Sequence, residues 1–123
     1  SDSHYMRVAE MYLLHAEAAA ENGNDGAARS SLKALLDLRI GDSSYVDALS
    51  GKALAEEAAL QARLELFAEG QSYFIMKRRR ETRTRGANWL DNAGESFSHT
   101  DERLTYEIPQ AEITFNPNLS EQN

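Results

Sequence analysis

A short turn signal constrains this chain more than any other feature. Residues 22–26 read Asn-Gly-Asn-Asp-Gly and separate two stretches of helix-forming sequence. Residues 5–21 are rich in Ala, Leu, Met and Glu and contain no Gly or Pro, which predicts a helix. Residues 27–39 predict a second helix, with Gly41 as its end. Two helices joined by so short a turn are expected to pack antiparallel. The inward face of the second helix is predicted to carry Ala28, Leu32, Leu35 and Leu36.

Side chains near these helix ends have the chemistry of caps. Ser3 or Asp2 is suited to begin the first helix, and Asn22 with Gly23 to close it in a left-handed conformation. Asp25 is the expected cap of the second helix. The resulting hairpin spans roughly the 34 residues of a tetratricopeptide unit. No second copy with this spacing follows, so we do not predict a repeat array.

The first helix is apolar around most of its circumference. Its main stripe is followed by further apolar positions on other faces, and such a helix favours burial on several sides. A chain of 123 residues offers few elements to cover it. We therefore expect either the rest of a longer polypeptide or another subunit to do so. The stripe is Tyr5, Ala9, Tyr12, Ala16 and Ala20, and the further positions are Val8, Met11, Leu13, Leu14 and Ala18.

Two more helices are predicted after a loop over residues 41–50. Ser50 is the expected cap of a helix over 52–68, Gly70 interrupts it, and 71–83 continue as a fourth helix. The inward side chains predicted for the third helix are Leu54, Leu60 or Gln61, Leu64 and Phe67, and the fourth helix carries Tyr73, Phe74 and Met76.

The remainder of the chain has weaker periodicity. Residues 86–106 are dominated by Gly, Asn, Asp, Ser and Thr and predict a long loop that holds the one tryptophan, Trp89. Residues 106–109 are expected to be extended, and Pro109 to start a short helix through Phe115. We expect this C-terminal strap to bury Ile108, Ile113, Phe115 and Leu119 against the helices. The predicted organisation is one all-α segment over 1–123, with a hairpin over 1–40, helices over 51–85, and a loop and strap over 86–123.

Composition excludes several classes of function. The net charge of −7 opposes nucleic-acid binding, although six of the thirteen Lys and Arg residues lie between Lys77 and Arg85. At helical spacing these residues would lie on all sides of a helix, and no aromatic residues alternate with them. This pattern favours a solvated helix end or a docking surface for acidic parts of a longer chain. There is no Cys, and no apolar run is long enough to span a bilayer as a helix. No export signal is visible in this stretch.

No catalytic set, metal site or cofactor is predicted. The sequence lacks a nucleophile elbow, a phosphate loop and a zinc-protease motif. His4 and His15 would lie too far apart on one helix to share a metal, and we interpret them and His99 as structural or solvated. Glu10 and Glu17 share a helical face, but Arg7 is placed for an ordinary ion pair with Glu10.

Three stretches, in order, resemble one protein family. Residues 7–18 contain Arg-Val-Ala-Glu, Leu-Leu and Ala-Glu-Ala, and residues 63–70 read Arg-Leu-Glu-Leu-Phe-Ala-Glu-Gly, followed by Lys77-Arg78. Residues 108–123 carry Ile-Pro-x-x-Glu-Ile, Asn-Pro-x-Leu and a final Gln-Asn. This combination resembles the SusD/RagB family. The chain departs from the family pattern at Ala62, Ser72 and Ile75, where Glu, Arg and Asp are usual.

The resemblance implies a C-terminal piece of a longer, tetratricopeptide-like protein. It implies a surface-exposed lipoprotein of the outer membrane, attached only through an N-terminal lipid anchor outside this segment. Such a protein captures oligosaccharides or other nutrients and passes them to a SusC-like TonB-dependent transporter. Glycan contacts vary within the family, so none is carried over. The alternative from the residues themselves is a tetratricopeptide-like protein–protein interaction module without glycan binding.

Trp89 is the one residue that we single out as a candidate ligand contact. An indole in a polar loop can stack on the C–H face of a sugar ring, and it can equally pin the loop onto the core. Both interpretations stay open from sequence alone.

Overall fold

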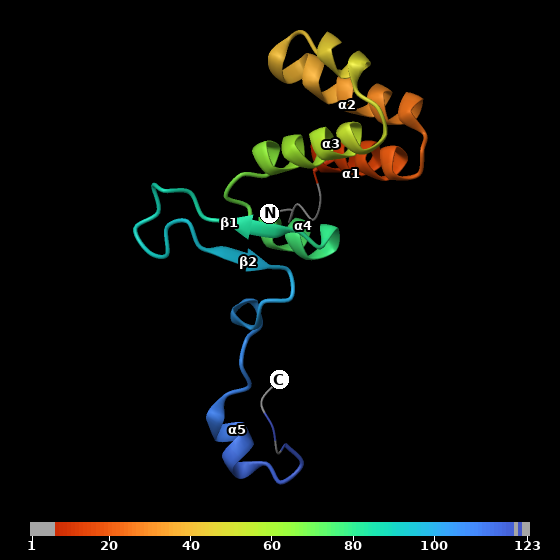
Figure 1. The fold of residues 1–123 in the computed structure, drawn as a ribbon. Coiled ribbons are helices and arrows are strands. Elements are labelled where there is room, and N and C mark those ends of the chain that lie inside the picture. The colour runs from red at the N-terminus through yellow and green to blue at the C-terminus, as the bar shows by residue number, and fades with distance from the viewer. Residues whose placement is uncertain (1–6, 120, 122–123) are drawn as a thin grey trace, which may run out of the picture. The chain divides into compact units, whose positions relative to one another are not determined.

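A computed structural model describes residues 7–119 and residue 121 (Figure 1). The chain divides into two compact units, residues 1–75 and residues 76–123. The first unit contains α1 (Val8–Glu21), α2 (Asp25–Ile40), the 3-10 helix η1 (Ser44–Ala48) and α3 (Gly51–Glu65), and α4 (Gln71–Arg79) begins within it. The second unit contains β1 (Thr82–Thr84), β2 (Ser96–Ser98), the 3-10 helix η2 (Glu102–Leu104) and α5 (Gln110–Phe115). The described part of the chain is therefore mostly helical, as predicted.

The predicted helical hairpin is present. α1 packs against both α2 and α3 (Figure 1). The side chains of His15 on α1 and Ser31 on α2 hydrogen-bond at 2.7 Å. Gly23 takes the left-handed conformation (φ 76°) that closes α1, because only glycine adopts it without steric cost. Gly41 does the same at the end of α2 (φ 79°).

Two of the predicted caps are wrong. Asn24, and not Asp25, caps α2, because its side-chain oxygen accepts a hydrogen bond from the Ala27 amide. Asp25 instead accepts from the backbone amide of Gly51 at 3.0 Å, which fixes the start of α3 beside the start of α2. α1 begins at Val8 with Arg7 in the capping position and without a side-chain cap. Asp2, Ser3 and Tyr5 lie outside the described residues.

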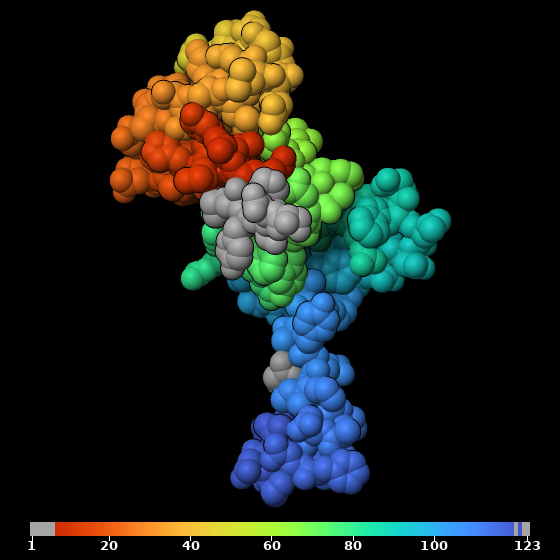
Figure 2. All heavy atoms as spheres, turned by 180° about the vertical axis from the view of Figure 1, so that it is seen from behind, coloured from red at the N-terminus to blue at the C-terminus, as the bar shows by residue number. Residues whose placement is uncertain are grey.

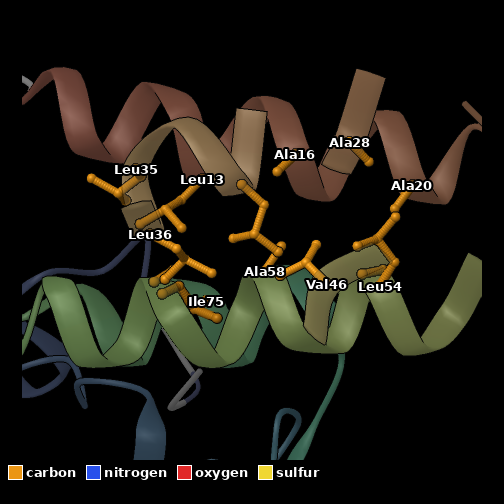
Figure 3. Packing of buried hydrophobic residues seen from close by; sticks show 13 residues of the cluster. Leu13, Ala16, Ala20, Ala28, Leu35, Leu36, Val46, Leu54, Ala58 and Ile75 are labelled. Atoms are coloured by element: carbon orange, nitrogen blue, oxygen red, sulfur yellow. The ribbon is translucent and has the colours of Figure 1, made fainter. Parts of the chain in front are cut away.

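The core of the first unit lies between α1, α2 and α3 (Figure 3). The predicted inward face of α2 is confirmed, since all four of its residues are buried. On α1, Ala16 and Ala20 are buried as predicted, but Leu13 joins them and Tyr12 is 42% exposed. Alanines at the contact let the helix backbones approach closely, so the larger leucines fill the spaces between them.

The predicted inward face of α3 is confirmed at Leu54 and wrong at Leu60, Leu64 and Phe67. α3 ends at Glu65, and its buried residues are one leucine and a set of alanines: Leu54, Ala55, Ala58, Ala59 and Ala62. Leu64 is 61% exposed and Phe67 is 80% exposed, while Leu60 also lies outward. The prediction assumed that the larger apolar side chains face inward, whereas close helix packing selected the small ones.

Glu65 ties together the ends of three segments. Its carboxylate accepts from the Arg39 guanidinium at the end of α2 at 2.8 and 2.9 Å. Arg7, before α1, donates to the Glu65 backbone carbonyl at 2.8 Å and to Glu69 at 2.7 Å. The predicted pair between Arg7 and Glu10 is therefore replaced by contacts that are distant in sequence. The hydrogen bond from Arg39 holds the pKa of Glu65 below its usual range.

The connection between α3 and α4 stores backbone strain. Ala68 has a φ of 63°, in the left-handed region that disfavours residues with a Cβ. Substituting Ala68→Gly is expected to raise the free energy of unfolding by about 0.5–1 kcal/mol, because the strain disappears. The matched control is Ala34→Gly, an exposed alanine within α2, which is expected to lose about 1 kcal/mol. Urea denaturation measures both, and destabilisation by both substitutions would contradict the strain at Ala68.

The second unit contains a hairpin that the sequence analysis missed. α4 ends at Arg79 and not at residue 83, and β1 pairs antiparallel with β2 in the register Thr82↔Ser98, Arg83↔Phe97 and Thr84↔Ser96. The predicted loop over 86–106 is thus a shorter loop followed by the strand β2 and the 3-10 helix η2. Ser and Thr on both strands gave no apolar alternation from which to recognise them.

The C-terminal strap has the predicted helix but lacks the predicted burial. Pro109 precedes α5, which runs to Phe115. No residue of α5 is buried, and Phe115 is 83% exposed. Ile108, Ile113 and Leu119 are only partly buried.

Candidate functional site

The loop between β1 and β2 presents Trp89. The Arg85 amide donates to the Glu95 carbonyl at 2.9 Å, and the Gly94 amide donates back to the Arg85 carbonyl at 3.0 Å. These bonds continue the ladder beyond the strands and close the base of the loop. In Figure 2 the atoms of the loop (teal) stand out from the hairpin as a lobe. The loop therefore projects from a hydrogen-bonded base.

Arginine and aromatic side chains alternate along one side of the hairpin. The Arg85 guanidinium carbon lies 4.9 Å from the Trp89 ring centroid and 4.9 Å from that of Phe97. The Arg103 guanidinium carbon lies 4.2 Å from the Phe97 centroid. Cations are attracted to aromatic faces, so the row of side chains Trp89, Arg85, Phe97 and Arg103 orients the Trp89 ring through its contact with Arg85. We call it the cation–aromatic ladder.

Carboxylates fix the far end of the cation–aromatic ladder. Arg103 donates to Asp101 at 2.8 Å and also to Glu95. The hydrogen bond from Arg103 lowers the pKa of Asp101 to about 2, so this carboxylate is charged at neutral pH. Arg103 is consequently neutralised by these two carboxylates, whereas no carboxylate among the described residues pairs with Arg85.

Trp89 lines an open depression of about 430 Å³ together with Arg85, Asn88, Leu90 and Asp91. Its side chain is 55% exposed. Arg85 donates to the Asp91 backbone carbonyl at 3.1 Å, which holds the loop over the guanidinium. A Cβ on Gly86 would lie 2.6 Å from the Asn88 side-chain oxygen, so glycine there allows Asn88 its position in the lining. The depression therefore combines an aromatic face with amide, guanidinium and carboxylate groups.

The basic run does not form one surface. Lys77 and Arg78 lie in the last turn of α4, and Arg79 and Arg83 both pair with Glu81, Arg79 at 2.8 Å. Only the last member of the run, Arg85, reaches the depression. The structure thus divides the run between a helix end, an ion-pair cluster and the candidate site. Sequence analysis missed the roles of Phe97 and Arg103, for which no motif gave a signal.

A second, smaller depression lies on α1 and α2. It has a volume of about 290 Å³ and is lined by Val8, Met11, Tyr12, His15 and Ser31. His15 is engaged with Ser31, and His4 lies outside the described residues. Over the described ranges 7–119 and 121, no group of three or more His, Asp or Glu side chains is placed to hold a metal ion.

Comparison with known proteins identifies the family to which the chain belongs. The sequence profile of the SusD family matches residues 1–123, and the chain therefore belongs to the SusD family. No curated protein and no solved structure matched it. Proteins of this family are carbohydrate-binding lipoproteins of outer-membrane nutrient uptake, and they are not enzymes. Within the described residues, no helix is both long and apolar enough to cross a membrane.

Proposed function

We propose that this chain is part of a nutrient-binding lipoprotein that captures oligosaccharides at the outer membrane. It would pass them to a SusC-like TonB-dependent transporter, with an N-terminal lipid anchor outside this segment as its only attachment to the membrane. The observation that carries the proposal is the family match over all 123 residues. The helical hairpin of the first unit is consistent with it.

Within this proposal, Trp89 is the sugar-stacking residue. Its indole is presented by a loop with a hydrogen-bonded base, one side is occupied by Arg85, and more than half of its surface is open. A pyranose ring has an apolar C–H face that matches an aromatic face, while its hydroxyls need polar partners. Asn88 and Asp91 in the same lining offer such partners.

The presence of a single tryptophan makes the test direct. Because Trp89 is the one indole of the chain, a change in tryptophan fluorescence during oligosaccharide titration reports on this site. Trp89→Ala is expected to weaken binding about tenfold, measured by titration calorimetry, since the stacking surface is lost. Trp89→Phe retains an aromatic face and is expected to lose less.

Phe115→Ala is the matched control for these variants. Phe115 is an exposed aromatic residue of the same unit that does not line the depression. It should leave oligosaccharide affinity unchanged. If an oligosaccharide bound Trp89→Ala as tightly as the unmodified chain, Trp89 would not be part of the binding site.

The second candidate function is a protein–protein interaction module. The observation that favours it is the apolar depression on α1 and α2, where Met11 is 57% exposed and Val8 is 69% exposed. Met11→Glu should abolish binding of a partner protein there and leave sugar binding intact. If the chain bound a peptide in this depression and bound no oligosaccharide, the second function would replace the first.

A further inference from the structure

The charge of Arg85 has no carboxylate partner in the part of the chain that the structure describes. Its one protein acceptor there is the Asp91 backbone carbonyl, at 3.1 Å. The Asp91 carboxylate lines the same depression but forms no ion pair with the guanidinium. Arg79, Arg83 and Arg103, in contrast, are each paired with a carboxylate. Arg85 therefore differs from these three arginines.

The environment of Arg85 strengthens this difference. The side chain is half-buried, with its guanidinium close to the rings of Trp89 and Phe97. Aromatic faces attract a cation, but they supply no hydrogen-bond acceptor in the plane of the guanidinium. One bond to a carbonyl leaves most of its five N–H groups for another acceptor. A partly desolvated guanidinium gains most from a carboxylate, which it binds with two parallel hydrogen bonds.

We infer that the Trp89 depression selects acidic sugars, with Arg85 binding the carboxylate of a uronic acid residue. The sugar ring stacks on Trp89, and its carboxylate lies at the edge of the guanidinium. This inference rests on the proposed glycan-binding function and adds the substrate class to it. Arg85 is then the specificity-determining residue of the site, and Asp91 opposes it through charge repulsion.

The test compares matched ligands on the complete 123-residue chain. Uronate oligosaccharides of several linkages are each titrated beside their carboxyl-reduced, neutral counterparts. The chain is expected to bind at least one acidic form about tenfold more tightly than its neutral counterpart. The preference should shrink at high salt, because screening weakens ion pairs. An unchanged ratio of the two affinities at high salt would contradict an ionic contact.

Variants then assign the preference to Arg85. Arg85→Gln should bring the acid-to-neutral affinity ratio close to one, whereas Arg85→Lys keeps the charge and should retain part of it. Asp91→Asn should raise the ratio, since a repelling charge is removed. Circular dichroism confirms that each variant is folded. A ratio that Arg85→Gln leaves unchanged would overturn the inference.

The outcomes separate this inference from the proposed function. Equal binding of acidic and neutral forms, lost in Trp89→Ala, would overturn the acidic preference and sustain glycan binding. Failure to bind any oligosaccharide of the panel, in either form, would overturn both.

Discussion

Leu32→Ala is expected to lower the free energy of unfolding by about 3–4 kcal/mol. The Leu32 side chain is completely buried in the core of the first unit. Its truncation removes buried methyl groups and leaves a cavity that rigid neighbouring helices fill only in part. A unit of 75 residues has a total stability of roughly 4–11 kcal/mol, so this loss leaves it near its unfolding limit. Urea denaturation measures the change. It is followed by circular dichroism at about 222 nm, a signal that comes mainly from the helices of the first unit.

Leu38→Ala is the matched control for Leu32→Ala. Leu38 lies in the same helix, α2, but is 78% exposed. The same truncation there leaves no cavity and should change the free energy of unfolding by less than about 0.5 kcal/mol. Similar losses at the two positions would contradict the packing of α2, since its buried face would then include Leu38.

The inward face of α2 was predictable from sequence, whereas that of α3 was not. In α2 the apolar residues Ala28, Leu32, Leu35 and Leu36 recur at helical spacing on one face, while Leu38 and Ile40 lie apart from them at the end of the helix, so one orientation satisfies most of the pattern. In α3 one face carries Leu54 with several alanines and another carries Leu60 and Leu64, and both faces are compatible with burial. The alanine face faces inward because α1 also presents Ala16 and Ala20 at the contact. Such a choice depends on the partner helix and is not encoded in the periodicity of α3.

The partners of polar side chains near the helix ends could not be predicted, because these side chains contact residues distant in sequence. Arg7 was assigned to Glu10 by local spacing, but it reaches the Glu65 carbonyl and Glu69. Asp25 was assigned to a cap, but it binds the amide of Gly51. In each case a contact from another segment replaces the local one. Sequence spacing alone cannot rank these alternatives, because their energies are similar.

Sequence alone predicted Trp89 as a candidate site residue, but it did not predict which side chains lie around it. Trp89 stood out because a lone tryptophan lay in a polar segment. Phe97 contacts Arg85 because the pairing of β1 with β2 brings residues 83 and 97 into register, and Arg103 of η2 joins only through its contact with Phe97. The strands are three residues long each and rich in Ser and Thr, and they carry too little pattern to be recognised. That Arg85 has no carboxylate partner among the described residues likewise emerges only when the partners of Arg79, Arg83 and Arg103 are known.

Glu65→Gln is expected to cost about 1–2 kcal/mol at neutral pH. The Glu65 side chain is 13% exposed and accepts two hydrogen bonds from Arg39, so its carboxylate is the charged centre that joins the ends of α2 and α3. Glutamine keeps the size of the side chain but removes the charge, and it offers one acceptor in place of two. Because both arginines are partly exposed, solvent screening keeps the loss modest. Urea denaturation of both proteins gives the difference.

Glu56→Gln provides the control in the same helix. Glu56 pairs with Lys52 at 3.6 Å, and both side chains are mostly exposed, so its loss should be below about 0.5 kcal/mol. The pH dependence gives a second measurement for Glu65. Its pKa in the folded chain is below the ordinary 4.5, so its contribution is complete above that pH. As the pH falls below that value, unfolding is favoured by proton binding, and the stability difference between the unmodified chain and Glu65→Gln should shrink. A difference that stayed constant from neutral pH into this acidic range would show that the carboxylate charge contributes nothing, and that Glu65 acts through its shape alone.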